Sequence, residues 1–257
     1  MKIKKEVLLD FLYKVGINGT MNKIMALDLT ADGIAASNMD DTNTALYSGK
    51  IKINSVADYT PSGKLGIVDI KFLTSVVNRL YNDIQVDIGT EGVLLKSDTK
   101  KILIALGDVE GLELHKLPEK FKPDIRLKVS TSKLKEILSD TSIFAEGAFI
   151  ELRMEKNAMK FIVGSDQKKE RMEDTLMCEY SGKDISSKFS KDIISNIFAV
   201  LSTKEVYISF GNDMPLVIEE DTGNIIGTYI VAPFVLPTDT EEKKPEPEPE
   251  KTVIEVL

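Results

Sequence analysis

Residues 64–80 read KLGIVDIKFLTSVVNRL, a stretch in which a short strand leads directly into an amphipathic helix. Lys64–Val68 is rich in residues that favour strands. Asp69 follows, and its carboxylate can accept hydrogen bonds from the first free amides of a helix. Four apolar residues then recur at positions i, i+3, i+4 and i+7, which places them on one helical face: Leu73, Val76, Val77 and Leu80. The stretch therefore predicts a strand followed by a helix that packs one face on a sheet.

This strand–helix pattern occurs four times, with successive apolar faces starting 65, 61 and 60 residues apart. Self-similarity at a nearly fixed period indicates an internally repeated structure. Ser130 and Ser190 stand at the N-cap positions of the third and fourth helices, and Thr141 is the one polar residue on the expected faces. The other short strands are Met1–Lys4, Ile125–Val129 and Ser187–Phe189. The other faces are Leu8, Phe11, Leu12 and Val15; Leu134, Ile137, Leu138 and Thr141; and Ile194, Ile197, Phe198 and Leu201.

Each helix is followed by runs of β-forming residues separated by turn residues, which predicts a meander of about three strands. One helix cannot cover such a sheet, so we expect the units to pair and to place two helices side by side. The expected fold class is α+β, with two similar domains of two strand–helix–meander repeats each. The connector contains glycine, proline and mixed charge. The expected parts are an N-terminal domain (1–106), an interdomain connector (107–123), a C-terminal domain (124–236) and a tail (237–257).

The tail differs from the rest of the chain in composition. Pro237–Lys251 alternates proline with glutamate, and such a segment has too few apolar residues to offset its ordering entropy, so we expect it to be disordered. The last six residues, Thr252–Leu257, are more apolar. They are either a short docking peptide or a free chain end.

The overall composition excludes several classes of protein. The chain has 257 residues, a net charge of −8, one Cys (Cys178) and one His (His115). A disulfide framework, a cysteine-built metal site and a pair of histidines on zinc are therefore excluded. The sequence has no run long and apolar enough for a transmembrane helix and no signal peptide at its start, so we expect a cytoplasmic protein with no membrane partner. An acidic average charge also argues, at first sight, against nucleic acid as a partner.

Three segments in chain order resemble the proliferating cell nuclear antigen (PCNA) family of sliding clamps. Residues 213–233, DMPLVIEEDTGNIIGTYIVAP, resemble the family's penultimate strand and its closing Tyr-x-x-Ala-Pro strand. Ser37–Asp40, followed by Leu46, is similar to a wall of the family's partner pocket. Leu117–Glu119 lies in the connector. Together with the fourfold repeat, the resemblance covers nearly all of the chain up to Leu236.

The resemblance implies a trimeric ring of two-domain subunits whose helices line a central hole for duplex DNA. Such a clamp tethers a polymerase and other replication or repair enzymes, is opened by a separate clamp loader, and has no catalytic residue, cofactor or metal of its own. The source is expected to be archaeal or viral, with a nuclear location if it is eukaryotic.

A sliding contact needs mobile cations that hold phosphates without reading bases, and lysine suits that role. The clamp fold would point the polar faces of all four helices at the hole. The same helices also carry Glu6, Asp10, Glu136, Asp140 and Asp192. The expected lining is therefore mixed and weakly positive. The candidate DNA-facing cations are Lys5, Lys14, Lys71, Arg79, Lys133, Lys135 and Lys191.

Two further sites follow from the resemblance. Family pockets accept an apolar plug from a partner's tail, and the corresponding residues are Met39, Thr44, Leu46, Leu117, Pro118, Pro215, Ile230, Ala232 and Pro233. Thr44 and Ile230 depart from the family pattern, in which an apolar β-branched residue and an aromatic residue are usual. Ring closure would pair two edge strands of neighbouring subunits. Its expected residues are Lys101, Ile102, Leu103, Ile104, Glu173, Asp174 and Leu176.

Two alternatives remain open at this point. The chain could be one subunit of a heterotrimeric or viral clamp. It could also be an enzyme on a repeated α+β scaffold, although adjacent carboxylates such as Asp40 and Asp41 on a strand point to opposite faces, and the sequence has no GxxxxGK[ST] or GxGxxG motif.

Overall fold

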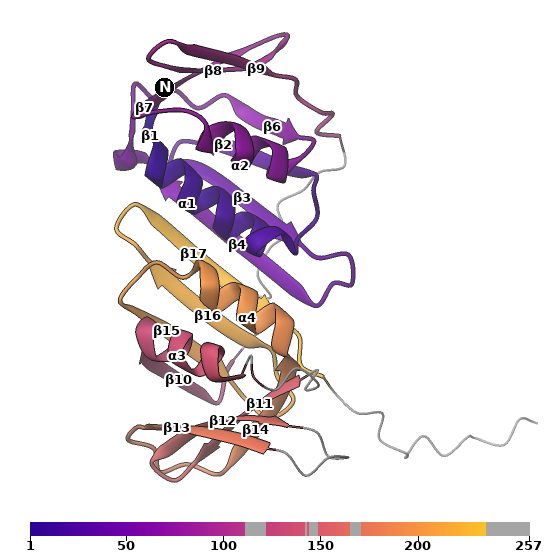
Figure 1. The fold of residues 1–257 in the computed structure, drawn as a ribbon, viewed down its shortest axis with the longest axis vertical. Coiled ribbons are helices and arrows are strands. Elements are labelled where there is room, and N and C mark those ends of the chain that lie inside the picture. The colour runs from indigo at the N-terminus through magenta and orange to yellow at the C-terminus, as the bar shows by residue number, and fades with distance from the viewer. Residues whose placement is uncertain (111–121, 142, 144–148, 165–170, 235–257) are drawn as a thin grey trace, which may run out of the picture.

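The computed structural model describes residues 1–110, 122–141, 143, 149–164 and 171–234 of the chain. The four helices of the described residues lie on one face of an elongated molecule, and the sheets lie behind and around them (Figure 1). The order from one end to the other is α2, α1, α4 and α3. Strands β8 and β9 form one end of the molecule, and β13 lies at the other. The helices are α1 (Lys5–Gly16), α2 (Ile70–Asn78), α3 (Thr131–Thr141) and α4 (Lys191–Val200), with short 3-10 turns at η1 (Ile17–Gly19) and η2 (Ile53–Ser55).

The predicted repeat of strand, helix and three strands is present four times. The first unit is β1 (Lys2–Lys4), α1, β2 (Met25–Thr30), β3 (Gly33–Met39) and β4 (Ala45–Lys52), followed by the two-residue β5 (Val56–Ala57). The second is β6 (Gly63–Ile67), α2, β7 (Asp83–Gly89), β8 (Gly92–Ser97) and β9 (Lys100–Ile104). The third is β10 (Ile125–Ser130), α3, β11 (Phe149–Glu155), β12 (Ala158–Gly164) and β13 (Arg171–Met177). The fourth is β14 (Ile185–Ser190), α4, β15 (Glu205–Phe210), β16 (Leu216–Asp221) and β17 (Ile225–Val231).

The helix signals in the sequence correspond to real contacts. The Asp69 carboxylate accepts a hydrogen bond from the Phe72 amide at 2.9 Å, and the Ser190 hydroxyl accepts one from the Ile193 amide at 3.4 Å. Ser130 Oγ instead lies 2.8 Å from Ser132 Oγ. Thr141 is buried on the apolar face of α3, and its hydroxyl donates a hydrogen bond to the Leu138 carbonyl at 2.8 Å. Its polar group is therefore satisfied within the helix.

The strands in the described part of the chain form three sheets, and the largest one crosses the middle of the molecule. Its order is β10-β15-β16-β17-β4-β3-β2-β6, so strands of the second unit and of both C-terminal units join those of the first. A five-stranded sheet, β5-β1-β7-β8-β9, and a four-stranded sheet, β13-β12-β11-β14, flank it. The two halves of the chain meet where β4 pairs antiparallel with β17, from Ile51 opposite Ile225 to Ala45 opposite Val231. The division into domains at residues 106 and 124 stays a prediction.

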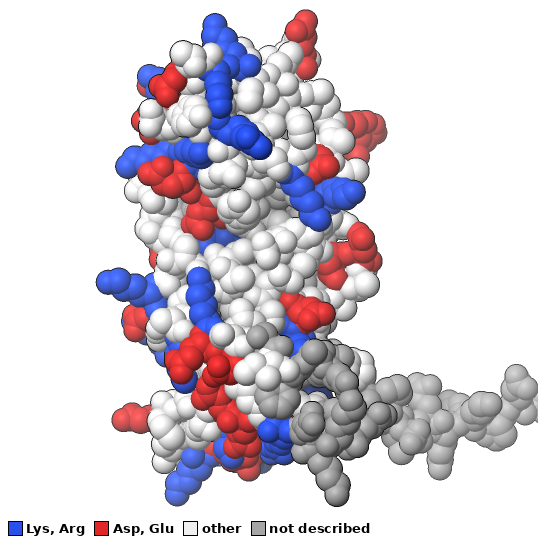
Figure 2. All heavy atoms as spheres, in the orientation of Figure 1, with Lys and Arg blue, Asp and Glu red and all other residues white. Residues whose placement is uncertain are grey.

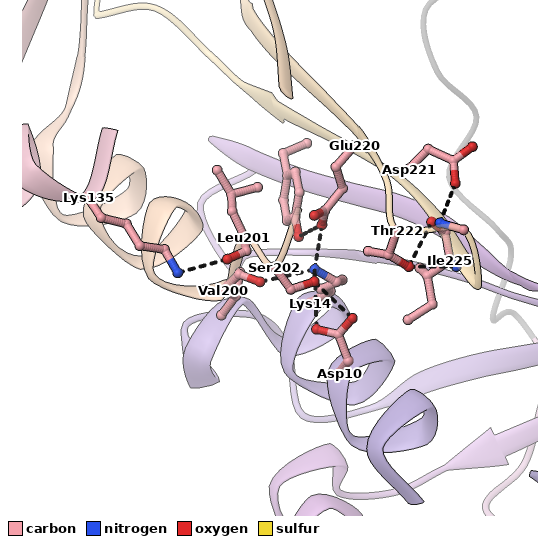
Figure 3. A network of polar contacts seen from close by, with 12 residues as sticks. Asp10, Lys14, Lys135, Val200, Leu201, Ser202, Glu220, Asp221, Thr222 and Ile225 are labelled. Atoms are coloured by element: carbon pink, nitrogen blue, oxygen red, sulfur yellow. Dashed lines mark hydrogen bonds and ion pairs between the residues drawn. The ribbon is translucent and has the colours of Figure 1, made fainter. Parts of the chain in front are cut away.

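A buried polar network lies between this seam and the helices that cover it (Figure 3). The Lys14 side chain, from α1, is fully buried, and its ammonium lies 2.7 Å from the Glu220 carboxylate of β16 and 3.3 Å from that of Asp10. It also donates to the Val200 carbonyl and to Ser202 Oγ, both at 3.0 Å. Burying a charge is costly unless it is paired and hydrogen-bonded. Here every partner except Asp10 comes from the other half of the chain.

Two buried tyrosines extend the network across β4 and β17. Tyr229 donates its hydroxyl to Glu220 Oε1 at 2.8 Å, and its ring lies 4.9 Å from that of Tyr47. Among the described residues, the Tyr47 hydroxyl has no hydrogen-bond partner. Burial, and then the negative charges of Glu220 and Asp10, raise the pKa of Tyr47 well above its ordinary value. Burial is also the main cause that raises the pKa of Tyr229, followed by the charge of Glu220.

The raised pKa of Tyr47 predicts a loss of stability at alkaline pH. The folded protein keeps the phenol protonated above about pH 10, where the unfolded chain releases its proton, so the free energy of unfolding falls as pH rises beyond that value. We expect Tyr47→Phe to have nearly wild-type stability at pH 7, since it removes a hydroxyl that has no partner. Its stability should fall less steeply above pH 10, by up to about 1.4 kcal/mol per pH unit.

Urea unfolding between pH 7 and 11 measures this slope. Tyr81→Phe, which changes an exposed tyrosine, is the control for the loss of a phenol as such. Equal slopes for Tyr47→Phe and the wild type would contradict the prediction.

Candidate functional site

The face that carries the four helices is the expected DNA-facing surface. Figure 2 shows cationic and anionic side chains interspersed on it, with a largely uncharged middle over α1 and α4. The face is therefore not a continuous basic surface.

Two of the seven predicted cations do not belong to this exposed surface. Lys14 is wrong as a DNA-facing residue, because its side chain has no exposure and is held by Glu220 in the network described above. Lys191 is also buried, with 9% of its surface exposed. Position on the polar face or flank of a helix was the criterion for both, and for Lys14 the packing of α1 against α4 and β16 at the seam covers the side chain.

Three other cations on these helices make contacts within the chain. Lys5 donates to the carbonyls of Asn78 and Leu80, at 2.8 and 2.6 Å. Lys135 donates to the Leu201 carbonyl at 2.8 Å. Both ammonium groups thus satisfy carbonyls at the C-terminal end of a neighbouring helix, where a cation is also favoured by the helix dipole. Lys133 lies 3.0 Å from the Glu136 carboxylate and 3.3 Å from that of Asp174.

The remaining two cations, Lys71 and Arg79, are exposed on α2 and at its end. Lys71 borders a groove of about 370 Å³ between α1 and α2. The groove has no carboxylate in its lining. Its polar members are Tyr13, Asn18, Lys71, Thr74, Ser75 and Asn78.

The second candidate surface is an apolar row on the opposite side of the central sheet. Tyr47 and Tyr229 point toward the helices, so their neighbours Leu46 and Ile230 point away from them. The strand register continues the row, with Met39 opposite Leu46, Leu46 opposite Ile230, and Ile230 opposite Val217. We call Met39, Leu46, Ile230 and Val217 the outer row.

The outer row contains three of the predicted pocket residues and one that sequence reasoning missed. Val217 could have been found, because it lies two residues after Pro215, within β16, and alternates with the inward-facing Leu216 and Ile218. Pro215, Ala232 and Pro233 are half-buried next to the ends of β16 and β17. Leu117 and Pro118 lie outside the described residues.

Thr44 serves the loop between β3 and β4, which explains its departure from the family pattern. Its hydroxyl lies 2.7 Å from Asp40 Oδ2, and the amides of Thr44 and Ala45 donate to Asp40 Oδ1 at 2.7 and 2.6 Å. Burial by itself would raise the pKa of Asp40, but the hydrogen bonds from Thr42, Ala45 and Thr44 outweigh it and lower the pKa. The ionised carboxylate thereby fixes the loop beside Leu46.

The predicted edge strands lie at the two ends of the molecule. β9 is the last strand of the five-stranded sheet, and β13 is the last strand of the four-stranded one (Figure 1). On β9, Lys101 and Leu103 are exposed, Ile102 is half-buried and Ile104 is buried. On β13, Glu173 is exposed, whereas Asp174 and Leu176 are half-buried.

The acidic side chains of β13 already have partners within the chain. Glu173 pairs with Lys160 and Arg171, each at 3.0 Å, and Asp174 pairs with Lys133. Because Glu173 and Asp174 are already paired within the chain, charge complementarity alone does not predict a contact between β9 and β13.

None of the helices in the described part of the chain is long and apolar enough to cross a membrane. The same residues contain no cluster of three or more His, Cys, Asp or Glu that could hold a metal ion.

No protein-family model matches the chain, and neither does any curated protein sequence. Solved structures do match. The PCNA of Entamoeba histolytica has a TM-score of 0.77 at 22% identity, over 91% of this chain and 98% of that one. The PCNA of A. fulgidus, bound to the C-terminal region of FEN-1, has a TM-score of 0.78 at 15% identity, with 91% of this chain and 98% of that one covered. The PCNA2–PCNA3 complex of Sulfolobus tokodaii has a TM-score of 0.75 at 16% identity, with 91% and 99% covered.

These likenesses extend over nearly the whole described chain, and they confirm the fold that the resemblance in sequence implied. The chain has the α+β fold of PCNA-like sliding clamps.

The burial of Lys14 predicts a stability effect that distinguishes a seam residue from a surface cation. Lys14→Met leaves the Glu220 carboxylate buried without its counter-charge, so we expect a loss of about 3–5 kcal/mol in the free energy of unfolding. Lys71→Met changes an exposed side chain on α2 and should change the free energy of unfolding by less than about 0.5 kcal/mol.

Denaturant unfolding of both variants, with Lys14→Met/Glu220→Gln as a third, measures the effect. The double variant should regain part of the loss because it no longer buries an unpaired carboxylate. A Lys14→Met protein as stable as Lys71→Met would show that the ion pair does not hold the seam.

Proposed function

We propose that this chain is a DNA sliding clamp, which closes with two further copies into a trimeric ring around duplex DNA and tethers polymerase and other replication or repair enzymes. The observation that carries the proposal is the arrangement of four helices on one face, with an unpaired strand at each end of the molecule. The clamp itself makes and breaks no bond. The proposal therefore assigns no catalytic residue, cofactor or metal.

Ring closure is proposed through β9 of one subunit and β13 of the next. Both strands present free backbone groups along one edge, and such edges favour pairing with another chain. Leu103, on β9, and Met177, at the end of β13, are large apolar residues with 55% and 79% of their surface exposed. A partner strand would cover them. The S. tokodaii complex of PCNA2 with PCNA3 keeps a heterotrimeric ring as the alternative.

The helix face is proposed to surround the DNA without reading its sequence. Lys71, Arg79 and Lys135 are the exposed cations of the predicted set, and they can approach phosphates, which carry no sequence information. Because carboxylates lie among them, retention on DNA is expected to come mainly from the closed ring. The acidic net charge is compatible with this because it is an average over the whole molecule.

The outer row is proposed as the site for partner peptides. A. fulgidus PCNA binds the C-terminal region of FEN-1, and the outer row offers apolar side chains for a short peptide of that kind. Met39 adds a side chain that adapts easily to different ligands. The protein would act wherever the DNA is replicated, in the cytoplasm of an archaeal or virally infected cell or in a nucleus.

A threading experiment tests encirclement without a loader. A duplex is fixed to a bead at one end, the protein is added at micromolar concentration, and an antibody then blocks the free end. We expect the protein to resist a wash with 0.5 M salt only when the antibody is added after the protein, because a closed ring cannot slide off a blocked duplex. Ordinary phosphate contacts would instead weaken steeply with salt. Cutting the duplex should release the protein.

Leu103→Asp is the matched variant, since it adds a charge to β9 at the proposed subunit contact, and Ile53→Asp is a control at an exposed apolar residue of η2. Sedimentation should give three times the chain mass of 28.5 kDa for the wild type and the control, and a smaller species for Leu103→Asp. Retention that ignores the order of antibody addition would contradict encirclement. A monomer at all micromolar concentrations would contradict the homotrimer and favour the heterotrimer.

The outer row gives a separate prediction about peptide binding. We expect Ile230→Asp to weaken binding of the FEN-1 C-terminal peptide at least tenfold, because a carboxylate would be desolvated in an apolar contact. Ile226→Asp lies on the same face of β17, four residues away, and should leave the affinity unchanged. Fluorescence polarisation with a labelled peptide measures both. Equal loss in the two variants would place the peptide elsewhere.

A further inference from the structure

The end of the described chain lies next to the outer row. Ile230 is a member of the row, and the Ala232 amide donates to the Thr44 carbonyl at 2.8 Å. The Phe234 amide then donates to the Lys188 carbonyl at 2.7 Å, and the Phe234 ring lies 4.1 Å from that of Phe149. These contacts fix the point from which the rest of the chain leaves. Four residues separate Phe234 from Ile230, a distance of at most about 14 Å.

The chain continues for 23 residues beyond Phe234. Most of them are proline, glutamate, lysine and threonine. The apolar exceptions at the end are Val253, Ile254, Val256 and Leu257, in the sequence TVIEVL. A charged, proline-rich spacer thus separates an apolar hexapeptide from the folded body.

We propose that residues 252–257 bind the outer row of their own chain. The row places four apolar side chains in register across β3, β4, β17 and β16. Met39 and Ile230 are half-buried and can be covered further, whereas Leu46 and Val217 are only 8% and 9% exposed. The hexapeptide also has four apolar side chains. Burial of such side chains is favourable in proportion to the area removed from water. The contact is mainly apolar, so it should depend little on salt.

The length of the spacer allows this contact. The 18 residues from Phe234 to Thr252 span up to about 60 Å when extended, several times the distance to the row. Because the spacer joins peptide and site, the local peptide concentration is of millimolar order. A peptide with a dissociation constant of about 1 mM would then occupy the row about half of the time.

The consequence is competition. A partner peptide that uses the outer row must displace the tail, so only partners with affinity well above that of the tail bind fully. This consequence rests on the proposed function of the row, but the contact between tail and row does not.

Photo-crosslinking in the full-length chain tests the contact. A benzophenone amino acid replaces Ile254 in one protein and Glu246, within the proline–glutamate spacer, in a control protein. On irradiation the benzophenone carbonyl abstracts a hydrogen from a nearby C–H group, and the two resulting radicals combine in a C–C bond. Peptide mass spectrometry then finds the attachment site. We expect the Ile254 probe to attach to Met39, Leu46, Ile230 or Val217 at least five times more often than the Glu246 probe.

Two variants test which residues are responsible. Ile230→Asp should lower the yield at the row at least fivefold, whereas Ile226→Asp should not. A probe at Leu257 combined with Ile254→Asp gives the same test from the tail, and its yield at the row should also fall at least fivefold. An equal yield from the Ile254 and Glu246 probes, or attachment mainly outside the row, would overturn the proposal.

Mixing ¹⁵N-labelled and unlabelled chains distinguishes the chain's own row from that of a second copy. Adducts within one isotope class support the proposal, and mixed adducts overturn it. The same measurement on Leu103→Asp separates this proposal from the ring. The tail contact should persist in that variant even if the protein no longer oligomerises, and a crosslink that disappears with the oligomer would overturn it.

Discussion

The antiparallel pairing of β4 with β17 is the constraint on which the rest of the structure depends. It joins strands that are about 180 residues apart in sequence into one eight-stranded sheet. On one side of that sheet it brings α1 and α4 together, so that four helices share one face. On the other side it places Leu46 opposite Ile230 and so completes the outer row. The helix face and the apolar row are therefore two consequences of a single strand register.

The Lys14–Glu220 ion pair depends on that register. A buried ion pair is weak evidence for stability, since the cost of removing two charges from water can exceed their attraction. Its geometry is nevertheless demanding, because the Lys14 ammonium contacts Glu220, Asp10, Ser202 and the Val200 carbonyl together. A shift of β17 by one residue would turn the inward side chains outward, and α1 would lose its partners on the other half. We infer that the pair specifies how the halves meet.

The local parts of this structure could be predicted from the sequence, whereas the contacts between distant segments could not. The helix face of Leu73, Val76 and Val77 follows from residue spacing within two helical turns. The cap at Asp69 follows from the residue type at the start of the helix. The burial of Lys14 depends on Glu220, 206 residues away, and helix spacing contains no information about that contact. A signal did exist on β16, where Glu220 continues the inward alternation of Leu216 and Ile218. An inward carboxylate requires a cation, and Lys14 is that cation. The roles of Lys5 and Lys135 at helix ends were hidden for the same reason, because each depends on a neighbouring helix.

The loss of Lys14 and Lys191 from the exposed set changes how a ring of this chain would hold DNA. Strong, closely spaced phosphate contacts give affinity, but each one must break before the protein can move along the duplex. A lining with few free cations, interspersed carboxylates and neutral donors such as Asn18, Ser75 and Asn78 would make contacts that form and break at low cost. In the proposed clamp, such a lining would contribute little to the retention of DNA by affinity. It suits the proposed clamp, which would retain DNA by enclosing it. Retention would then depend on closure of the ring through the edge strands β9 and β13, more than on contacts from the helices.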